Sequence, residues 1–403
     1  MRFRSVFAAF AFGYMVASFL RAANAVISAD LMQELALNAD QLGTMTSIYY
    51  ISFSLMQLPL GAALDRYGSR IVIPLLMIPT VIGCVLFATA TSFWPLALGR
   101  TLIGLGTAGG LMGAVKTFGN WVPKNQLATM TSVMVALGAC GGLLSTSPMA
   151  YFADTYGWRT IFLVSAPIVA CIAYGIRRIG HDAPHTPSLG KPGGSVLDGY
   201  AEIYTHRTFL RMAPLYFSML GSMLAVQTLW AGPFAYDVAR VSSSDVGLLL
   251  LVLGIGAVLG YAASGILSDR FGGVNVLIGA QIVMLTTLAY FVFIPFPATP
   301  ATLFAVYGIF GFGSSFNVIM LPQVRTLFAD TMSGRAATAL NIFGFFGGWV
   351  LQWVMGQVIN YVGRTPSGHY IASGYQWAFS IPFVLGCIAL IIYIPLIRTL
   401  QKG

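Results

Sequence analysis

Charged residues are scarce in this sequence, in which 21 Lys and Arg and 12 Asp and Glu make up only 8% of 403 residues. An ordinary soluble domain carries about 25% charged residues. Because 57% of the residues are hydrophobic, so few charges cannot cover a surface exposed to water. The composition therefore excludes a soluble enzyme or a nucleic-acid-binding module, despite a net charge of +9, and it also excludes a disordered chain.

Cysteine is rare and shows no functional spacing. Cys84, Cys140, Cys171 and Cys387 all lie in apolar runs, without the spacing of metal ligands. Free cysteine packs as a small hydrophobic side chain, so we expect four buried free thiols. The sequence also lacks a nucleotide-binding loop and paired catalytic carboxylates, and it therefore predicts no enzyme activity, no metal site and no cofactor.

Long apolar runs dominate the sequence instead. A bilayer core of about 30 Å needs about 20 apolar residues in a helix. The run after the basic Met1–Ser5 is too long for a cleavable signal peptide, so we expect it to remain as the first span. Twelve stretches of about the required length follow one another along the chain: 6–28, 42–63, 71–91, 94–114, 127–150, 160–176, 212–233, 246–266, 275–295, 300–322, 338–360 and 376–397.

The basic residues indicate the orientation. If the N-terminus lies in the cytoplasm, sixteen of the 21 Lys and Arg fall in cytoplasmic segments or at their helix ends, and only Arg159, Arg240 and Arg364 fall outside. Cytoplasmic loops carry such an excess, so the net charge is mostly a topology signal. The absence of any Asn-x-Ser/Thr site fits a prokaryotic source. We expect a multi-pass protein of the bacterial inner membrane with both termini in the cytoplasm.

The two halves of the sequence repeat each other. Residues 42–73 align with residues 246–277 at an offset of 204, matching Gly43 with Gly247, Gly61 with Gly265, Asp65-Arg66 with Asp269-Arg270 and Gly68 with Gly272. Six helices repeated in the same orientation form a parallel repeat, with a binding site at mid-bilayer between the halves. The sequence predicts an all-α membrane protein of twelve transmembrane helices in two six-helix bundles, 1–176 and 212–403, joined by a cytoplasmic linker, 177–211.

The repeated loop carries a family motif. It reads Gly61-Ala-Ala-Leu-Asp65-Arg66-Tyr-Gly68-Ser-Arg70 after the second stretch and Gly265-Ile-Leu-Ser-Asp269-Arg270-Phe-Gly272 after the eighth. The pattern Gly-x-x-x-Asp-Arg-x-Gly-x-Arg resembles the major facilitator superfamily, and the resemblance covers essentially the whole chain. It implies that Asp65, Arg66, Arg70, Asp269 and Arg270 form a latch on the cytoplasmic side, although the second copy lacks the last Arg. The alternative is that Arg66 and Arg70 only fix the topology.

The fourth and fifth stretches carry two further comparisons. Arg100-x-x-x-Gly104-x-Gly106 resembles a fourth-helix motif of the superfamily that is linked to coupling. The alternative is a structural Arg100 that caps carbonyls of a neighbouring helix, because a charge inside a span needs a partner or a water-filled cavity. The fifth stretch has Gly138, Gly141 and Gly142 but not the Gly-Pro-x-x-Gly-Gly signature of drug/proton antiporters. That difference lowers the case for a drug exporter.

The first stretch provides the main candidate for substrate contact. At 100° per residue, Tyr14, Ser18 and Arg21 form one stripe, with Asn24 on its flank. Arg21 lies about 22 Å from the cytoplasmic end at 1.5 Å per residue, and a charge at that depth is functional by default. Phe19-Leu-Arg21-Ala-Ala-Asn24 is similar to the first helix of the superfamily's organic phosphate and organic anion carriers. The alternative is structural pairing of Arg21.

Other stretches offer uncharged polar side chains and one indole. These candidate substrate contacts could equally be helix–helix hydrogen bonds: Tyr50, Gln57, Gln227, Trp230, Asn317, Asn341 and Gln352.

The distribution of charge indicates the substrate class. No Asp, Glu or His lies in the middle of a predicted span, whereas Arg21 and Arg100 do lie in spans. The sequence therefore predicts a monomeric secondary transporter that moves a small organic anion, a carboxylate or a phosphate, by alternating access, with a proton or a counter-substrate as coupling partner. Seventeen Met and 13% aromatic residues also suit the alternative of an exporter of amphiphilic or aromatic compounds. A transporter-like ligand sensor and a lipid-moving protein are further alternatives.

Overall fold

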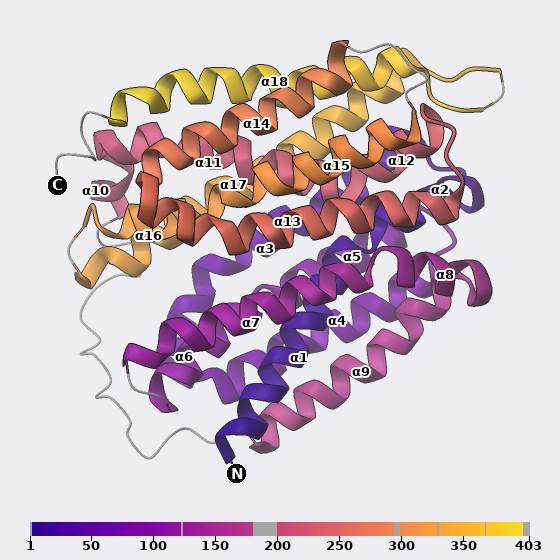
Figure 1. Ribbon diagram of the computed structural model, residues 1–403. Helices are drawn as coiled ribbons and strands as arrows, with labels where there is room; N and C mark the ends of the chain where they lie inside the picture. The colour runs from indigo at the N-terminus through magenta and orange to yellow at the C-terminus, as the bar shows by residue number, and fades with distance from the viewer. Residues whose placement is uncertain are drawn as a thin grey trace. The chain divides into compact units, whose positions relative to one another are not determined.

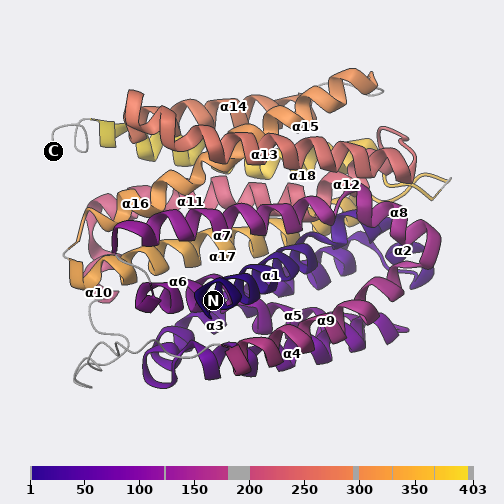
Figure 2. The same ribbon diagram turned by 60° about the horizontal axis from the view of Figure 1, so that its bottom comes forward.

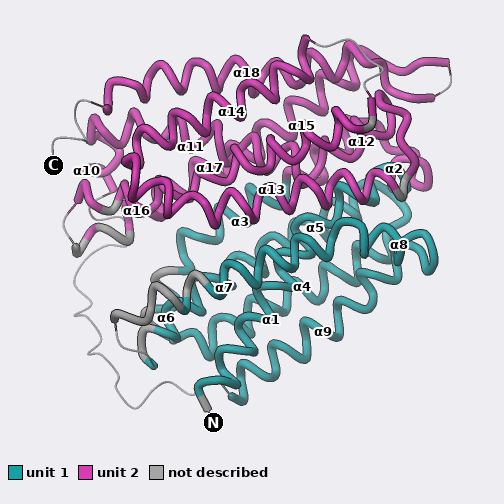
Figure 3. The backbone as a smooth tube through the Cα atoms, in the orientation of Figure 1, with its two compact units in different colours: residues 1–30, 48–196 teal, residues 31–47, 197–403 magenta. Residues whose placement is uncertain are grey.

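The computed structural model describes residues 2–121, 124–179, 200–293, 299–328, 330–366 and 368–397. These residues are almost entirely helical (Figure 1). Within these ranges the extended pairing is a single antiparallel bridge between Arg364 and Tyr370. The chain divides into two compact units, one of residues 1–30 and 48–196 and the other of residues 31–47 and 197–403 (Figure 3).

Unit 1 contains the helices of the N-terminal half, two of which run on into unit 2. Their bounds are α1 Arg2–Ala22, α2 Asn24–Glu34, α3 Ala39–Tyr67, α4 Ser69–Thr89, α5 Phe93–Thr107, α6 Gly110–Trp121, α7 Lys124–Leu144, α8 Ser147–Tyr156 and α9 Trp158–Ile179. In this unit α1 packs against α7 and α9, and α4 packs against α5 and α9 (Figure 2). An aromatic cluster around the buried Phe118, with Phe7 and Phe10, closes the end of the unit near the N-terminus.

Unit 2 contains the C-terminal half. Its elements are α10 Tyr200–Thr205, α11 Arg207–Ala225, a π-helical turn Val226–Trp230, α12 Ala231–Asp237, α13 Ser243–Phe271, α14 Gly273–Phe293, α15 Pro300–Ser314, a 3-10 turn Ser315–Ile319, α16 Met320–Arg325, α17 Asp330–Val362, α18 Ala372–Tyr393 and a final 3-10 turn Ile394–Leu396. The strongest packing is between α11 and α17 and between α13 and α15. The predicted linker 177–211 lies partly outside the described residues, since 180–199 are not described.

The all-α membrane fold predicted from the sequence is confirmed. All twelve predicted stretches fall on helices. In the part of the chain that the structure describes, nine helices are long and apolar enough to cross a membrane, or ten if the bent pair α7 and α8 counts as one span. The second and fourth stretches do not reach that limit. The fourth stretch is divided into the shorter α5 and α6.

Interruptions occur in corresponding stretches of the two halves. The first stretch breaks at Ala23, between α1 and α2, and the seventh contains the π-helical turn Val226–Trp230. The repeat offset of 204 places Ala23 opposite Gln227. The fourth stretch breaks at residues 108–109, and the tenth passes through the 3-10 turn Ser315–Ile319. Such irregular turns inside spans need other hydrogen-bond donors and acceptors, because lipid supplies none.

The prediction of four buried thiols is correct only in part. The four cysteines are free, but Cys140 and Cys171 are exposed, Cys387 is partly exposed, and only Cys84 is buried. The inference failed because an apolar residue in a membrane span can face lipid as readily as the protein interior.

Candidate functional site

Arg21 lies in the last turn of α1, next to the point where that helix ends. Its side chain is partly exposed, and Nη2 donates a hydrogen bond to Ser18 Oγ at 3.3 Å. Arg21 is close enough to interact electrostatically with the Tyr49 hydroxyl and with the guanidinium of Arg100. Tyr14 interacts with Tyr49 in the same way. Unit 1 therefore brings three residues of the predicted stripe together with a second Arg.

The end of α1 is held by Arg100. In an uninterrupted α-helix the backbone oxygens of Leu20 and Arg21 would accept from residues 24 and 25. Here α1 stops before Ala23, and Arg100 donates from Nη1 to Leu20 O and from Nη2 to Arg21 O, both at 2.7 Å. Arg100 thus caps the carbonyls of a neighbouring helix, the structural alternative considered from the sequence. Its predicted role in coupling stays a prediction.

Tyr49 completes the surroundings of Arg100. Arg100 is fully buried, and its guanidinium lies 4.7 Å from the centre of the Tyr49 ring, while the Tyr49 hydroxyl is 2.8 Å from Thr107 Oγ1. Gly104 allows this close packing, because a Cβ at that position would meet the Tyr49 backbone and Ser52 Oγ. A cation over a desolvated aromatic face is attracted by the ring, so Tyr49 stabilises the buried charge.

The two candidates on α3 support neighbouring elements. Tyr50 is fully buried and meets Tyr49 edge to face, with ring centres 5.2 Å apart. Gln57 donates from Nε2 to Ala108 O at 3.0 Å, at the break between α5 and α6. Gln57 therefore caps an interrupted helix, as Arg100 does.

Tyr14 lies in α1, and Asn24 lies directly after the break at Ala23. The Tyr14 ring packs against Gly138 of α7 and reaches Gly110 of α6, so that a Cβ at Gly138 would overlap the ring. Asn24 is the first residue of α2 and is fully buried.

In unit 2, Gln352 of α17 donates hydrogen bonds to residues at the π-helical turn. Its Nε2 donates to Leu224 O at 3.2 Å and to Thr228 Oγ1 at 2.9 Å, and Thr228 Oγ1 in turn donates to Leu224 O at 2.6 Å. Trp230 donates from Nε1 to the backbone oxygen of Gln352 at 3.1 Å. Gln352 and Trp230 are both buried, so these two candidates form helix–helix hydrogen bonds.

The remaining candidates of unit 2 differ in exposure. Asn341 Oδ1 accepts from the Tyr216 hydroxyl at 3.2 Å. Asn317, in the 3-10 turn, donates to Ser314 O at 2.7 Å and contacts the sulfur of Met223 at 3.5 Å. Gln227 is the partly exposed residue of the otherwise buried turn Val226–Trp230.

The residues of the predicted latch are only partly described. The side chains of Asp65 and Arg66 lie outside the described residues. Arg70 donates from Nε to Arg177 O at 3.0 Å, which ties the start of α4 to the end of α9. Asp269 and Arg270 are exposed at the end of α13. The latch stays a prediction.

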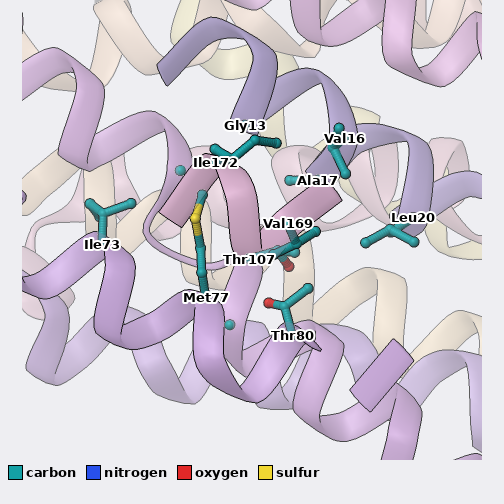
Figure 4. A pocket seen from close by; sticks show the side chains of 12 residues that line it. Gly13, Val16, Ala17, Leu20, Ile73, Met77, Thr80, Thr107, Val169 and Ile172 are labelled. Atoms are coloured by element: carbon teal, nitrogen blue, oxygen red, sulfur yellow. The ribbon is translucent and has the colours of Figure 1, made fainter. Parts of the chain in front are cut away.

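A small apolar cavity lies inside unit 1, on another face of α1. Gly13, Val16, Ala17 and Leu20 line it on one side, and α4, α5, α6 and α9 supply the rest of the lining, including Thr80 (Figure 4). It has room for about one water molecule. At 100° per residue its α1 lining is turned about a third of a circle away from the stripe of Tyr14, Ser18 and Arg21. The cavity lies on a different face of α1 from this stripe, but it adjoins the candidate site, because Thr107 and Gly110, which contact Tyr49 and Tyr14, also line it.

Two residues were not predicted from the sequence. Tyr49 packs on the Arg100 that caps the end of α1, and Thr228 bonds Leu224 O and Gln352 at the π-helical turn. Tyr49 adjoins the chosen Tyr50 but points to another face of α3, and it could have been found by asking which aromatic ring covers a buried Arg100. Thr228 matches Asn24 at the repeat offset, so the repeat itself was the available signal. The part of the chain that the structure describes holds no group of three or more His, Cys, Asp or Glu placed to bind a metal ion.

Two repeated helical halves with matched interruptions and buried polar residues define a membrane transporter of small molecules. The chain belongs to the Major Facilitator Superfamily, whose family model matches residues 10–352. It is a secondary transporter and not an enzyme.

Several known proteins are similar to this chain. The "Putative tartrate transporter" of Agrobacterium vitis is 27% identical over 402 positions, covering 90% of this chain and 88% of that protein. The hexuronate transporter of Bacillus subtilis is 25% identical and covers 66% of both chains. The multidrug resistance protein MdtG of Salmonella dublin is 25% identical, covering 73% of this chain and 72% of that protein.

Solved structures agree on the fold. The crystal structure of a bacterial homologue of the human lysosomal transporter Spinster superposes with a TM-score of 0.75 at 18% identity, covering 98% of this chain and 97% of that chain. At that identity the similarity concerns the fold alone.

Proposed function

We propose that this transporter carries a small organic anion, a carboxylate or a phosphate, and that Arg21 binds it. The observation that carries the proposal is the placing of two guanidinium groups, Arg21 and Arg100, within electrostatic reach of each other at the interrupted end of α1. Two neighbouring positive charges at low dielectric favour an anion between or beside them.

The two Arg residues have different tasks in this proposal. Arg100 is fully buried and bonded to two carbonyls. It would therefore hold the end of α1 in place and add a positive electrostatic potential, without touching the anion. Arg21 is partly exposed and can turn its planar fork toward a ligand, which it would hold through two parallel hydrogen bonds. Tyr14 and Ser18 lie on the same stripe and would add neutral donors.

The relatives support this proposal and its alternative to different degrees. Two carry names for tartrate and hexuronate, which are organic anions, whereas MdtG is named for multidrug resistance. The fifth stretch lacks the antiporter signature, which favours the anion. Export of amphiphilic or aromatic compounds stays the second candidate. The bacterial inner membrane, cytoplasmic termini, a monomeric state and coupling to a proton or counter-substrate complete the proposal.

The test is uptake by the purified full chain in proteoliposomes. A panel of labelled dicarboxylates, sugar acids, organic phosphates and amphiphilic cations would be offered with and without a pH gradient. We expect saturable uptake of at least one anion, and its loss in Arg21→Ala. Arg159→Ala is the matched control, because Arg159 also bonds backbone oxygens, those of Ala88 and Ala90, but far along the chain from α1. Uptake of only the amphiphilic compounds, unchanged in Arg21→Ala, would overturn the anion proposal.

A further inference from the structure

Residues 31–47, between the first and second predicted spans, are part of unit 2. Ala39 N donates to the Tyr370 hydroxyl at 2.5 Å, and Arg364 donates from Nη2 to Leu37 O at 3.1 Å. Asp40 accepts a hydrogen bond from Gln357 of α17. We call residues 31–47 the docking segment, because hydrogen bonds from several elements hold it on the C-terminal helices.

Close backbone packing reinforces this docking. A Cβ on Gly43 would lie 2.9 Å from Gln352 O, and a Cβ on Gly356 would lie 2.7 Å from Ala39 O. The Trp230 ring lies against both glycines. Only glycine permits such an approach, so small shifts of the segment change many contacts together.

A buried carboxylate lies beside the docked segment. Asp237, at the end of α12, is 5% exposed, and its Oδ1 is 3.1 Å from His369 Nδ1. The Tyr375 hydroxyl donates to Oδ2 at 2.7 Å, and the backbone N–H of Tyr370 adds a further hydrogen bond. The His369 side chain is 23% exposed and is therefore open to protons from the solvent.

Two routes connect His369 with the docking segment. Its ring centre is 5.2 Å from that of Tyr236, whose hydroxyl accepts from Gln33 Nε2 at 3.2 Å. The next residue, Tyr370, accepts from Ala39 N. A change in how His369 is held therefore reaches the segment at two places, Gln33 and Ala39.

The other ionisable groups near this cluster come from several parts of unit 2. Tyr236 belongs to α12 and Tyr375 to α18. The connection before α18 supplies Tyr370 and Arg364, whose guanidinium lies 4.5 Å from the Tyr370 ring centre. The docking segment adds Asp40, next to Ala39. Tyr307 of α15 interacts electrostatically with Tyr375.

We propose that Asp237 and His369 form a proton-binding site that controls the docking of residues 31–47 on the C-terminal helices. When Asp237 is a carboxylate, it accepts a hydrogen bond from His369 Nδ1, which leaves Nε2 of the ring as the position for an added proton. The resulting imidazolium–carboxylate bond is charge-assisted and about twice as strong as the neutral one. Acid on this side, predicted to be the outside, therefore tightens docking, and alkali loosens it.

This site does not depend on the anion proposal, because neither Arg21 nor a transported substrate enters it. Its test is made without substrate, so that failure here leaves the role of Arg21 untouched.

The test compares two introduced thiols in the full-length protein in proteoliposomes. Leu37→Cys places a thiol at a buried position of the docking segment, and Ala36→Cys places one at the neighbouring exposed position. Modification by a membrane-impermeant maleimide is read by mass spectrometry of the peptide that contains the thiol. We divide the modification rate of Leu37→Cys by that of Ala36→Cys. Both rates share the pH dependence of the thiol–maleimide reaction, so their ratio reports how often the buried position becomes exposed.

We expect this ratio to fall about fivefold between pH 8 and pH 5.5. In His369→Gln and in Asp237→Asn the ratio should lose its pH dependence. His206→Gln is the matched control, since His206 begins α11 and packs on Phe328, and it should keep the wild-type response. A ratio that is independent of pH in the wild type, or a response that survives His369→Gln, would overturn the proposal. If Asp237→Asn does not fold, the His369→Gln arm decides.

Discussion

Leu20 and Leu224 occupy equivalent positions in the internal repeat, 204 residues apart, and the backbone oxygen of each accepts a hydrogen bond from a side chain of another helix. Arg100 is the donor to Leu20, and Gln352 is the donor to Leu224. Both oxygens precede an interruption of the first helix of their half. In each half, a side chain from another helix therefore bonds a backbone oxygen beside an irregular turn, but the donor is Arg in one half and Gln in the other.

Arg100→Lys should destabilise the protein. A lysine ammonium cannot reproduce the planar fork that bonds two carbonyls at once, so one buried carbonyl loses its partner. The expected loss is roughly 1–3 kcal/mol for each buried carbonyl left unpaired. Thermal unfolding of the purified protein measures it, with the exposed Arg270→Lys as control. Equal melting temperatures for the two variants would contradict the capping role.

Gln352→Leu should cost less than Arg100→Ala. Leu224 O keeps a hydrogen bond from Thr228 Oγ1 when Gln352 is lost, whereas both oxygens capped by Arg100 lose that donor. We expect about 1 kcal/mol for Gln352→Leu. The double variant of Gln352→Leu with Thr228→Val should lose more than the sum of the two single losses, because Leu224 O then has neither side-chain donor. Additive single effects in thermal unfolding would contradict the shared role of the two donors.

Arg21→Lys should retain only weak binding of the anion. Losing a charge-assisted fork in a partly desolvated site costs on the order of 2–5 kcal/mol. That range corresponds to roughly thirtyfold or more in affinity. Ligand-induced thermal shift of the wild type and the variant measures the change. A normal anion-induced shift together with a lower basal stability would assign Arg21 a structural role only.

Gly138→Ala should disturb the candidate site through Tyr14. The added methyl overlaps the Tyr14 ring, and overpacking of this kind costs about 1–3 kcal/mol. Gly142→Ala on the same helix meets no atom within 4 Å and is the matched control. We expect weaker anion binding and lower stability for the first variant and wild-type values for the second. Similar binding by both variants would show that Tyr14 does not contribute.

Asp65→Asn should slow transport far more than it weakens binding. Asp65 belongs to the predicted cytoplasmic latch, far along α3 from the start of that helix, and a latch biases the conformations without touching the ligand. Uptake rates in proteoliposomes and thermal-shift affinities separate the two effects. An unchanged rate would leave Asp65 as a topology residue.

Hydropathy and the repeat predicted where the helices lie, because apolar runs of membrane length are visible in the sequence. They could not predict the interruptions. Residues 6–28 have the length of one span, and Ala23 is itself a good helix former, so we predicted a single helix there. The break becomes visible only when Arg100, 80 residues away, is seen bonded to Leu20 O.

The contact between Asp237 and His369 could not be predicted from the sequence either. The two residues are separated by 132 positions, and neither lies in a recognisable motif. Burial was also misjudged for Cys140 and Cys171, since composition does not distinguish a lipid-facing surface from a protein interior. Long-range packing decides both features.

The position of Trp230 gives the protein an optical reporter of its own. Its ring is 1% exposed, rests against Gly43 and Gly356, and has its N–H bonded to Gln352 O. When the start of α3 moves away from α17, water reaches this indole and its emission shifts to longer wavelength. The difference between the spectra of the wild type and Trp230→Phe isolates that signal from the other six tryptophans, so the separation of two helices can be followed in real time without any attached dye.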